Sequence, residues 1–155
     1  MSLYESTTWL MLGCYGAAVT SALLPWVNAE LLMLSAMPVA AAHGSLLPLA
    51  AVFTLGQMTG KSVMFWLSRR TSLPSSRMRD AVESWRGRFE RHPHSALACV
   101  FVSAALGFPP FYAVSIAAGA LRMAFGLFLA VGGIGRFVHF GTILVGWQWA
   151  VGGRQ

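Results

Sequence analysis

Four side chains that can carry charge interrupt apolar stretches of this sequence, namely Glu30, Lys61, Arg136 and His139. An ionisable group at membrane depth is costly, so it indicates a functional site by default. A carboxylate can carry a proton, and a lysine or arginine can bind phosphate. We expect Glu30 either to pair with Lys61 or Arg136, or to cap a helix at an interface. We interpret His139 as a packed or interfacial side chain rather than a ligand.

The sequence contains no motif typical of an enzyme. We find no phosphate-binding glycine loop, no nucleophile elbow and no histidines at metal-ligand spacing. Serine, histidine and glutamate occur, but no spacing connects them. We therefore expect a protein that is not an enzyme and that has neither a metal nor a cofactor.

The composition predicts an integral membrane protein. Of 155 residues, 56% are hydrophobic and only 10% are charged, with a mean hydropathy of +0.62. Soluble domains carry about 25% charged residues. The net charge of +6 could indicate a nucleic-acid partner, but the basic residues concentrate in the linker Arg69–Arg91. We therefore expect no nucleic-acid partner, and we expect this linker to lie on the cytoplasmic side of a membrane.

The first half of the chain reads as two apolar segments around Glu30. Thr8 to Leu24 is uncharged, and Pro25 ends or kinks it. The run from Pro25 to Glu30 is compatible with a turn in which Asn28 is the N-cap of the next helix and Glu30 lies in its first turn. The apolar stretch Leu31–Ala42 would continue this helix.

A turn at His43–Ser45 leads into Leu46–Leu67, which we predict to be a membrane-spanning helix. Gly56, Gly60 and Ser62 form a small-residue face on it that would let another helix approach closely. Lys61 lies beside this face, where its amine could pair with Glu30 or extend to an interface.

The polar linker, which we place at residues 69–94, contains apolar residues at spacings of three and four that include Trp85. We interpret it as an amphipathic helix on the anionic cytoplasmic leaflet. The alternative is an ordinary connector. Cys14 and Cys99 lie in apolar segments, and we expect both to be buried small residues.

The stretch Ser103–Gly119 is apolar, but Gly107, Pro109 and Pro110 interrupt it. Adjacent prolines remove two backbone donors, and such a break is tolerated in hydrocarbon only inside protein or beside a wet cavity. We predict a broken or re-entrant helix, of the kind that builds substrate sites in transporters. The alternatives are a proline-kinked helix and two helices joined by a short loop.

Several short patterns, taken in their order and spacing, resemble the DedA family, whose domain is also called the VTT or SNARE-associated domain. The resemblance covers nearly the whole chain and is greatest to the YqaA-type branch. The patterns are Gly56-x-x-x-Gly60-Lys61-x-x-x-Phe65-x-x-Ser68-Arg69, Phe108-Pro109-Pro110-Phe111-Tyr112, Gly119-Ala-Leu-Arg-Met123, Phe128, Gly135-Arg136 and the run from Pro25 to Glu30.

The resemblance implies two re-entrant hairpins that meet from opposite sides, and transport or scrambling of phospholipids or polyprenyl-phosphate carriers. The chain departs from the family pattern in three places. Lys61 replaces an acidic residue, Phe65 replaces a tyrosine, and no arginine lies between Cys99 and Pro109. Glu30 is then the one acidic residue at plausible depth.

We therefore predict an all-α polytopic membrane protein with two broken or re-entrant segments, Pro25–Ala42 and Ser103–Gly119, forming a single domain over residues 1–155. Its leading predicted function is movement of a lipid phosphate across a bilayer, with membrane lipids as partners and a homo-oligomer left open. A proton-coupled small-solute transporter and a non-transporting scaffold are the alternatives. If the resemblance holds, the location is a bacterial inner membrane. The predicted substrate-binding residues are Glu30, Lys61, Pro109, Pro110 and Arg136, and Arg122 is a weaker candidate because we place it at an interface.

Overall fold

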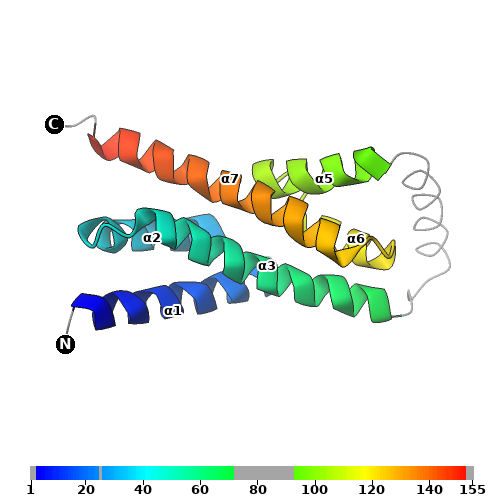
Figure 1. The fold of residues 1–155 in the computed structure, drawn as a ribbon, viewed down its shortest axis with the longest axis horizontal. Helices are drawn as coiled ribbons and strands as arrows, with labels where there is room; N and C mark the ends of the chain where they lie inside the picture. Colours follow the sequence, from blue (N-terminus) through cyan, green and yellow to red (C-terminus); the bar gives the residue numbers. More distant parts are fainter. Residues whose placement is uncertain (1–2, 25, 72–92, 153–155) are drawn as a thin grey trace. The chain divides into compact units, whose positions relative to one another are not determined.

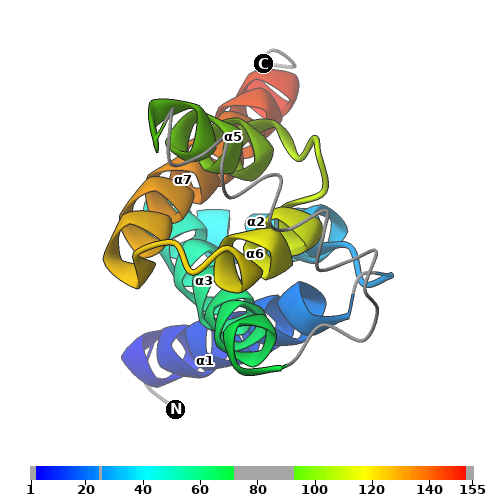
Figure 2. The same ribbon diagram turned by 90° about the vertical axis from the view of Figure 1, so that its right-hand side faces the viewer.

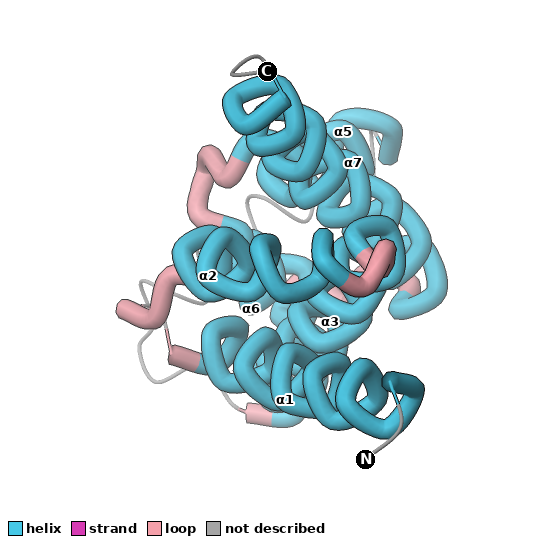
Figure 3. The backbone as a smooth tube through the Cα atoms, turned by 90° about the vertical axis from the view of Figure 1, so that its left-hand side faces the viewer, coloured by secondary structure: helices cyan, strands magenta, loops and turns pink. Residues whose placement is uncertain are grey.

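The computed structural model describes residues 3–24, 26–71 and 93–152. Within these ranges the chain forms α-helices joined by short loops and no β-strand (Figures 1 and 3). The all-α prediction is therefore confirmed for the described residues, whereas the predicted interfacial helix lies almost entirely outside them. In chain order the helices are α1 (Leu3–Leu23), α2 (Ala29–Ala42), α3 (Leu46–Arg70), α5 (Pro93–Leu106), α6 (Phe111–Ala120) and α7 (Phe125–Gly152).

The chain divides into two compact units. Unit 1 consists of Met1–Gly60 together with Arg136–Gln155, and unit 2 is Lys61–Gly135. Unit 1 thus contains α1, α2, the first part of α3 and the last part of α7. Unit 2 contains the rest of α3, α5, α6 and the beginning of α7.

The helix break predicted around Pro25 is present in unit 1. Helix α1 ends at Leu23 and α2 begins at Ala29. The side chain of Asn28 accepts hydrogen bonds from the backbone N–H groups of Glu30, at 2.8 Å, and Leu31, at 3.3 Å. Asn28 is therefore the predicted N-cap, and Glu30 lies in the first turn of α2. The Asn28 side chain thereby satisfies two donors that the start of a helix would otherwise leave unpaired.

The break predicted around Pro109 and Pro110 is present in unit 2, between the end of α5 at Leu106 and the start of α6 at Phe111. Gly107 turns the chain with a φ of +76°, a conformation that glycine adopts without steric cost. The hydroxyl of the buried Ser103 donates a 2.6 Å hydrogen bond to the carbonyl of Pro109. This bond ties the break back to α5.

The short helices α2 and α6 end in the same way. At the end of α2, Gly44 has a φ of +64°, and its N–H and that of Ser45 donate to carbonyls of the last turn. At the end of α6, Arg122 has a φ of +57°, and its N–H and that of Met123 donate at the corresponding positions. Both are Schellman motifs. Each half of the chain therefore runs through a helix, a break, a short helix, a Schellman turn and a long helix.

Glycines on the long helices allow close packing against their neighbours. A Cβ added at Gly56 would lie 2.7 Å from the Cβ of Ala18 on α1, and one added at Gly60 would collide with Ala22. In unit 2 a Cβ at Gly135 would lie 2.7 Å from the Cβ of Ala104 on α5. The predicted close approach is therefore confirmed at Gly56 and Gly60 of α3, and α7 carries a counterpart at Gly135.

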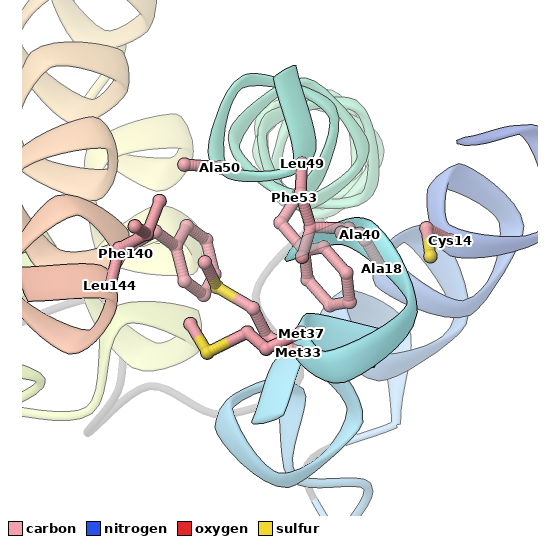
Figure 4. Packing of buried hydrophobic residues seen from close by; sticks show 10 residues of the cluster. All are labelled: Cys14, Ala18, Met33, Met37, Ala40, Leu49, Ala50, Phe53, Phe140 and Leu144. Atoms are coloured by element: carbon pink, nitrogen blue, oxygen red, sulfur yellow. The ribbon is translucent and has the colours of Figure 1, made fainter. Parts of the chain in front are cut away.

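The core of unit 1 is assembled from α1, α2, α3 and α7. Phe53 of α3 and Phe140 of α7 pack edge to face with ring centroids 5.6 Å apart, and Met33 and Met37 of α2 point toward them (Figure 4). Aromatic pairs favour this geometry, and methionine fills irregular gaps beside them. The buried members of the cluster are Cys14, Ala18, Met33, Met37, Ala40, Leu49, Ala50, Phe53, Phe140 and Leu144.

The core of unit 2 brings α6 beside the C-terminal part of α3 (Figure 2). A Cβ added at Gly119 would collide with the backbone of Phe65 and with the hydroxyl of Ser68. Phe128 of α7 stacks on Phe65 at 4.9 Å and on Phe111 of α6 at 6.0 Å. All three aromatic rings are buried.

By length and composition, α7 is the one described helix able to cross a membrane. Only 28% of its most apolar 18-residue stretch is buried, so most of that stretch does not pack as a core helix. The helix expected at Leu46–Leu67 forms as part of α3, but α3 falls short of the hydropathy of a span, so our expectation that it crosses a membrane stays a prediction. Buried polar residues on α3, including Thr54, Gln57 and Lys61, lower its hydropathy.

Candidate functional site

Glu30 and His139, both in unit 1, meet where α2 begins. The Nε2 atom of His139, on α7, lies 2.9 Å from Oε1 of Glu30, which is a hydrogen-bond distance. The His139 side chain is 13% exposed and the Glu30 side chain 47%. The Glu30 side chain is therefore partly exposed, while one of its carboxylate oxygens contacts a largely buried imidazole. Asn28 fixes the backbone from which Glu30 projects.

Arg136 lies one helical turn before His139, on the same side of α7. The negative charge of Glu30 attracts its guanidinium group. Its Cζ atom lies 5.8 Å from the ring centroid of Phe140, and its Nε atom is buried. The guanidinium thus lies near an aromatic face and feels the charge of a carboxylate, and both favour a cation.

The sequence analysis missed the role of His139. The signal was the spacing of three residues between Arg136 and His139, which puts both on one face of a helix. That spacing alone does not reveal Glu30, which comes from a helix more than a hundred residues earlier in the chain. The contact between Glu30 and His139 depends on tertiary packing.

Lys61 belongs to unit 2 and is 4% exposed. It shares a face of α3 with Phe65 and Ser68, the face against which Gly119 of α6 packs. Glu30 lies in unit 1, so the predicted pair of Glu30 and Lys61 stays a prediction. A buried lysine held among aromatic and small residues is nevertheless unusual, since lysine is almost never fully buried without compensation.

Lys61 and Arg136 occupy matching positions in their helices. Each cation follows a glycine, Gly60 or Gly135, and each precedes a buried phenylalanine by four residues. A second buried phenylalanine stands eight residues before each cation. The two patterns are Phe53, Gly60-Lys61 and Phe65 on α3, and Phe128, Gly135-Arg136 and Phe140 on α7.

Pro109 and Pro110 lie in the break of unit 2, and both are exposed. Neither ring can donate a backbone hydrogen bond, and α6 begins at Phe111 without a side-chain cap. The neighbouring Phe108 is 78% exposed. Among the predicted site residues, Glu30 and Arg136 are thus together in unit 1, whereas Lys61, Pro109 and Pro110 belong to unit 2.

The arrangement offers chemistry of two kinds. A guanidinium can bind a phosphate through two parallel hydrogen bonds. A carboxylate bonded to an imidazole can take up or release a proton. No group of three or more histidine, cysteine or acidic side chains in the described part of the chain could hold a metal ion.

Comparison with known proteins adds no relative: no family model, no curated protein and no solved structure matches the chain.

Proposed function

We propose that this protein is a polytopic membrane protein of the DedA type that moves a lipid phosphate across the bilayer. The observation that carries the proposal is the position of Arg136. This cation lies within the helix that is apolar enough to cross a membrane. The charge of Glu30, at the start of α2, stabilises it, and Glu30 itself contacts His139 of α7. A guanidinium at that depth can replace the water that a phosphate group loses on entering hydrocarbon.

The exposed surface supports the membrane location. Large apolar side chains are exposed on every described helix, among them Trp9 on α1, Leu31 on α2 and Leu106 on α5. Large apolar side chains exposed on this many helices fit contact with lipid or with a partner.

The helix lengths support re-entrant segments. Helix α2 has 14 residues and α6 has 10, so at 1.5 Å per residue they span about 21 Å and about 15 Å. The hydrocarbon core is about 30 Å thick. Neither helix crosses it alone, and each follows a break that exposes backbone groups. In transporters such half-helices surround the substrate.

The test is a scrambling assay with purified protein in liposomes. Fluorescent phospholipid in the inner leaflet should become accessible to an impermeant reductant, and it should do so far more slowly with Arg136→Met. A polyprenyl phosphate added to parallel liposomes would distinguish the two lipid classes. A protein that moves neither lipid would contradict the proposal and favour a scaffold.

A second candidate, a proton-coupled small-solute transporter, is favoured by the contact between Glu30 and His139. It predicts that an imposed pH gradient drives uptake of a solute and that Glu30→Gln abolishes the uptake. Passive lipid scrambling would need no such gradient.

A further inference from the structure

A second cationic group lies in unit 2, at the C-terminal end of α3. Arg70 is exposed, and its Cζ atom lies 5.9 Å from the ring centroid of Trp66. Arg69 is half-buried, with Cζ 5.3 Å from the Trp66 ring and 5.9 Å from the Phe65 ring. Two guanidinium groups therefore share one indole.

The turn after α6 adds a third arginine to this group. Nη1 of Arg69 donates a 3.2 Å hydrogen bond to the carbonyl of Met123. Arg122, the preceding residue, is exposed and has a φ of +57°. The bond ties the end of α3 to the turn between α6 and α7 that carries Arg122. Among the described residues, it is the one side-chain hydrogen bond of Arg69, a residue with five donors.

No acidic residue occurs among the described residues of unit 2, residues 61–71 and 93–135. Within these ranges, therefore, no carboxylate neutralises the three arginines. Trp66 is 41% exposed beside them, and tryptophan and arginine together are typical of the level of the lipid head groups. An anion bearing several oxygens fits between guanidinium groups because each can donate two parallel hydrogen bonds.

We propose that Arg69, Arg70 and Arg122 bind the phosphate of an anionic phospholipid at the membrane surface, with Trp66 against its glycerol region. These three arginines are different residues from the predicted transport cations Lys61 and Arg136. The inference rests on the membrane location in the proposed function, but not on transport. Binding of this lipid would hold the end of α3 and the α6–α7 turn at the head-group level.

The test measures lipid binding to purified protein in a neutral detergent. Phosphatidylglycerol and phosphatidylcholine are titrated separately, and bound lipid is counted by native mass spectrometry. We expect phosphatidylglycerol to bind more tightly, with an affinity that falls as salt rises. The double variant R70Q/R122Q should weaken phosphatidylglycerol binding about fivefold for each arginine, since a surface cation contributes about 1 kcal/mol toward an anionic lipid.

Two controls keep the result interpretable. R70Q/R122Q leaves the hydrogen bond of Arg69 to Met123 in place, and its helical content shows whether it is folded. Arg69→Lys retains the positive charge but removes the planar guanidinium, so it tests whether that group is needed. His43→Gln, at an exposed histidine of unit 1, should leave phosphatidylglycerol binding unchanged.

A third titration uses soluble glycerol phosphate. We expect no competition at millimolar concentration, because the lipid is also held by its acyl chains. Equal binding of phosphatidylcholine, unchanged binding in R70Q/R122Q, or full competition by glycerol phosphate would each overturn the proposal. A protein that retains phosphatidylglycerol but moves no lipid would refute only the transport function.

Discussion

The two units use the same backbone order to position different chemistry. In unit 1 the break leads to Glu30, whose carboxylate meets His139 and the charge of Arg136. In unit 2 the break leads to Ser115, a buried serine that donates to the carbonyl of its own helix at Phe111. Counted from the prolines Pro25 and Pro110, Glu30 and Ser115 occupy the same position.

The units also differ in how they stabilise the break. Unit 1 caps α2 with the side chain of Asn28, whereas unit 2 has no side-chain cap on α6 and instead ties the break to α5 through Ser103. The cation of unit 1 has an acid beside it, and none of the described residues of unit 2 is acidic. The comparison teaches that the repeated frame does not itself decide the chemistry. One acidic side chain at the first break makes unit 1 the candidate for proton or cation exchange.

The largest effect should come from joining the helices of unit 2. Replacing Pro109 and Pro110 with alanine restores two backbone donors, so α5 and α6 can approach one continuous helix. We expect lipid transport to fall to the background of empty liposomes while the protein is still produced. Pro48→Ala is the matched control, because Pro48 lies in the first turn of α3, where proline is tolerated. Full activity in the double variant would refute a functional break.

The next largest effect on transport should come from Arg136 and Glu30 in unit 1, and the corresponding Ser115 in unit 2 should matter less. We expect Arg136→Met to slow transport about tenfold to a hundredfold, which corresponds to the loss of one charged hydrogen bond of about 1.5–3 kcal/mol. Glu30→Gln should slow it as well, because it leaves the guanidinium without its nearby charge. Ser115→Ala, the corresponding change in unit 2, should alter the rate less than twofold, since its bond is local.

A double variant tests whether Glu30 and Arg136 act together. If they act as one group, E30Q/R136M should be no slower than the slower single variant. Rates that multiply would show that the two residues act independently. If Glu30→Gln transports like the unchanged protein at every pH, the Glu30 carboxylate serves only to stabilise the start of α2. The two units would then not differ in the chemistry of their breaks.

A smaller effect concerns the packing of α6 on α3. Gly119→Ala places a methyl group against the backbone of Phe65, which cannot move aside as a flexible side chain can. We expect a loss of about 1–3 kcal/mol in the free energy of unfolding, measured by denaturation in detergent. Gly126→Ala, where a Cβ meets nothing within 4 Å, is the control and should not destabilise the protein. Equal stability of both variants would contradict the close approach of α6.

The smallest effect should come from the cap of unit 1. Asn28→Ala removes the acceptor for two N–H groups at the start of α2 and should lower the free energy of unfolding by about 1 kcal/mol. Asn28→Asp should retain most of it, because aspartate caps equally well. The thermal midpoints of the two variants, measured in one detergent, give the comparison. If alanine and aspartate behaved alike, the start of α2 would owe its stability to packing alone.

Local features of this fold were predictable from the sequence, and tertiary ones were not. The prolines predicted both breaks, and Asn28 predicted the start of α2, because these residues affect the backbone only a few positions away. Gly56 and Gly60 predicted a close helix contact because their small size permits it. His139 could not be assigned, because its partner Glu30 comes from a distant segment. The span expected at Leu46–Leu67 stays a prediction, because the polar residues that α3 buries lower the hydropathy that an apolar count would suggest.

The brevity of α6 has a consequence for how the chain would be inserted as it is synthesised. Ten residues are too few for the insertion machinery to accept as an independent membrane segment, which takes about 20. In a membrane protein, α6 would therefore enter only together with α5, as a hairpin bent at Gly107 and closed by Ser103. If the ribosome is stalled between these helices, α5 should be incompletely integrated into the membrane. Insertion of this half of the protein would then be completed only once α6 has left the ribosome.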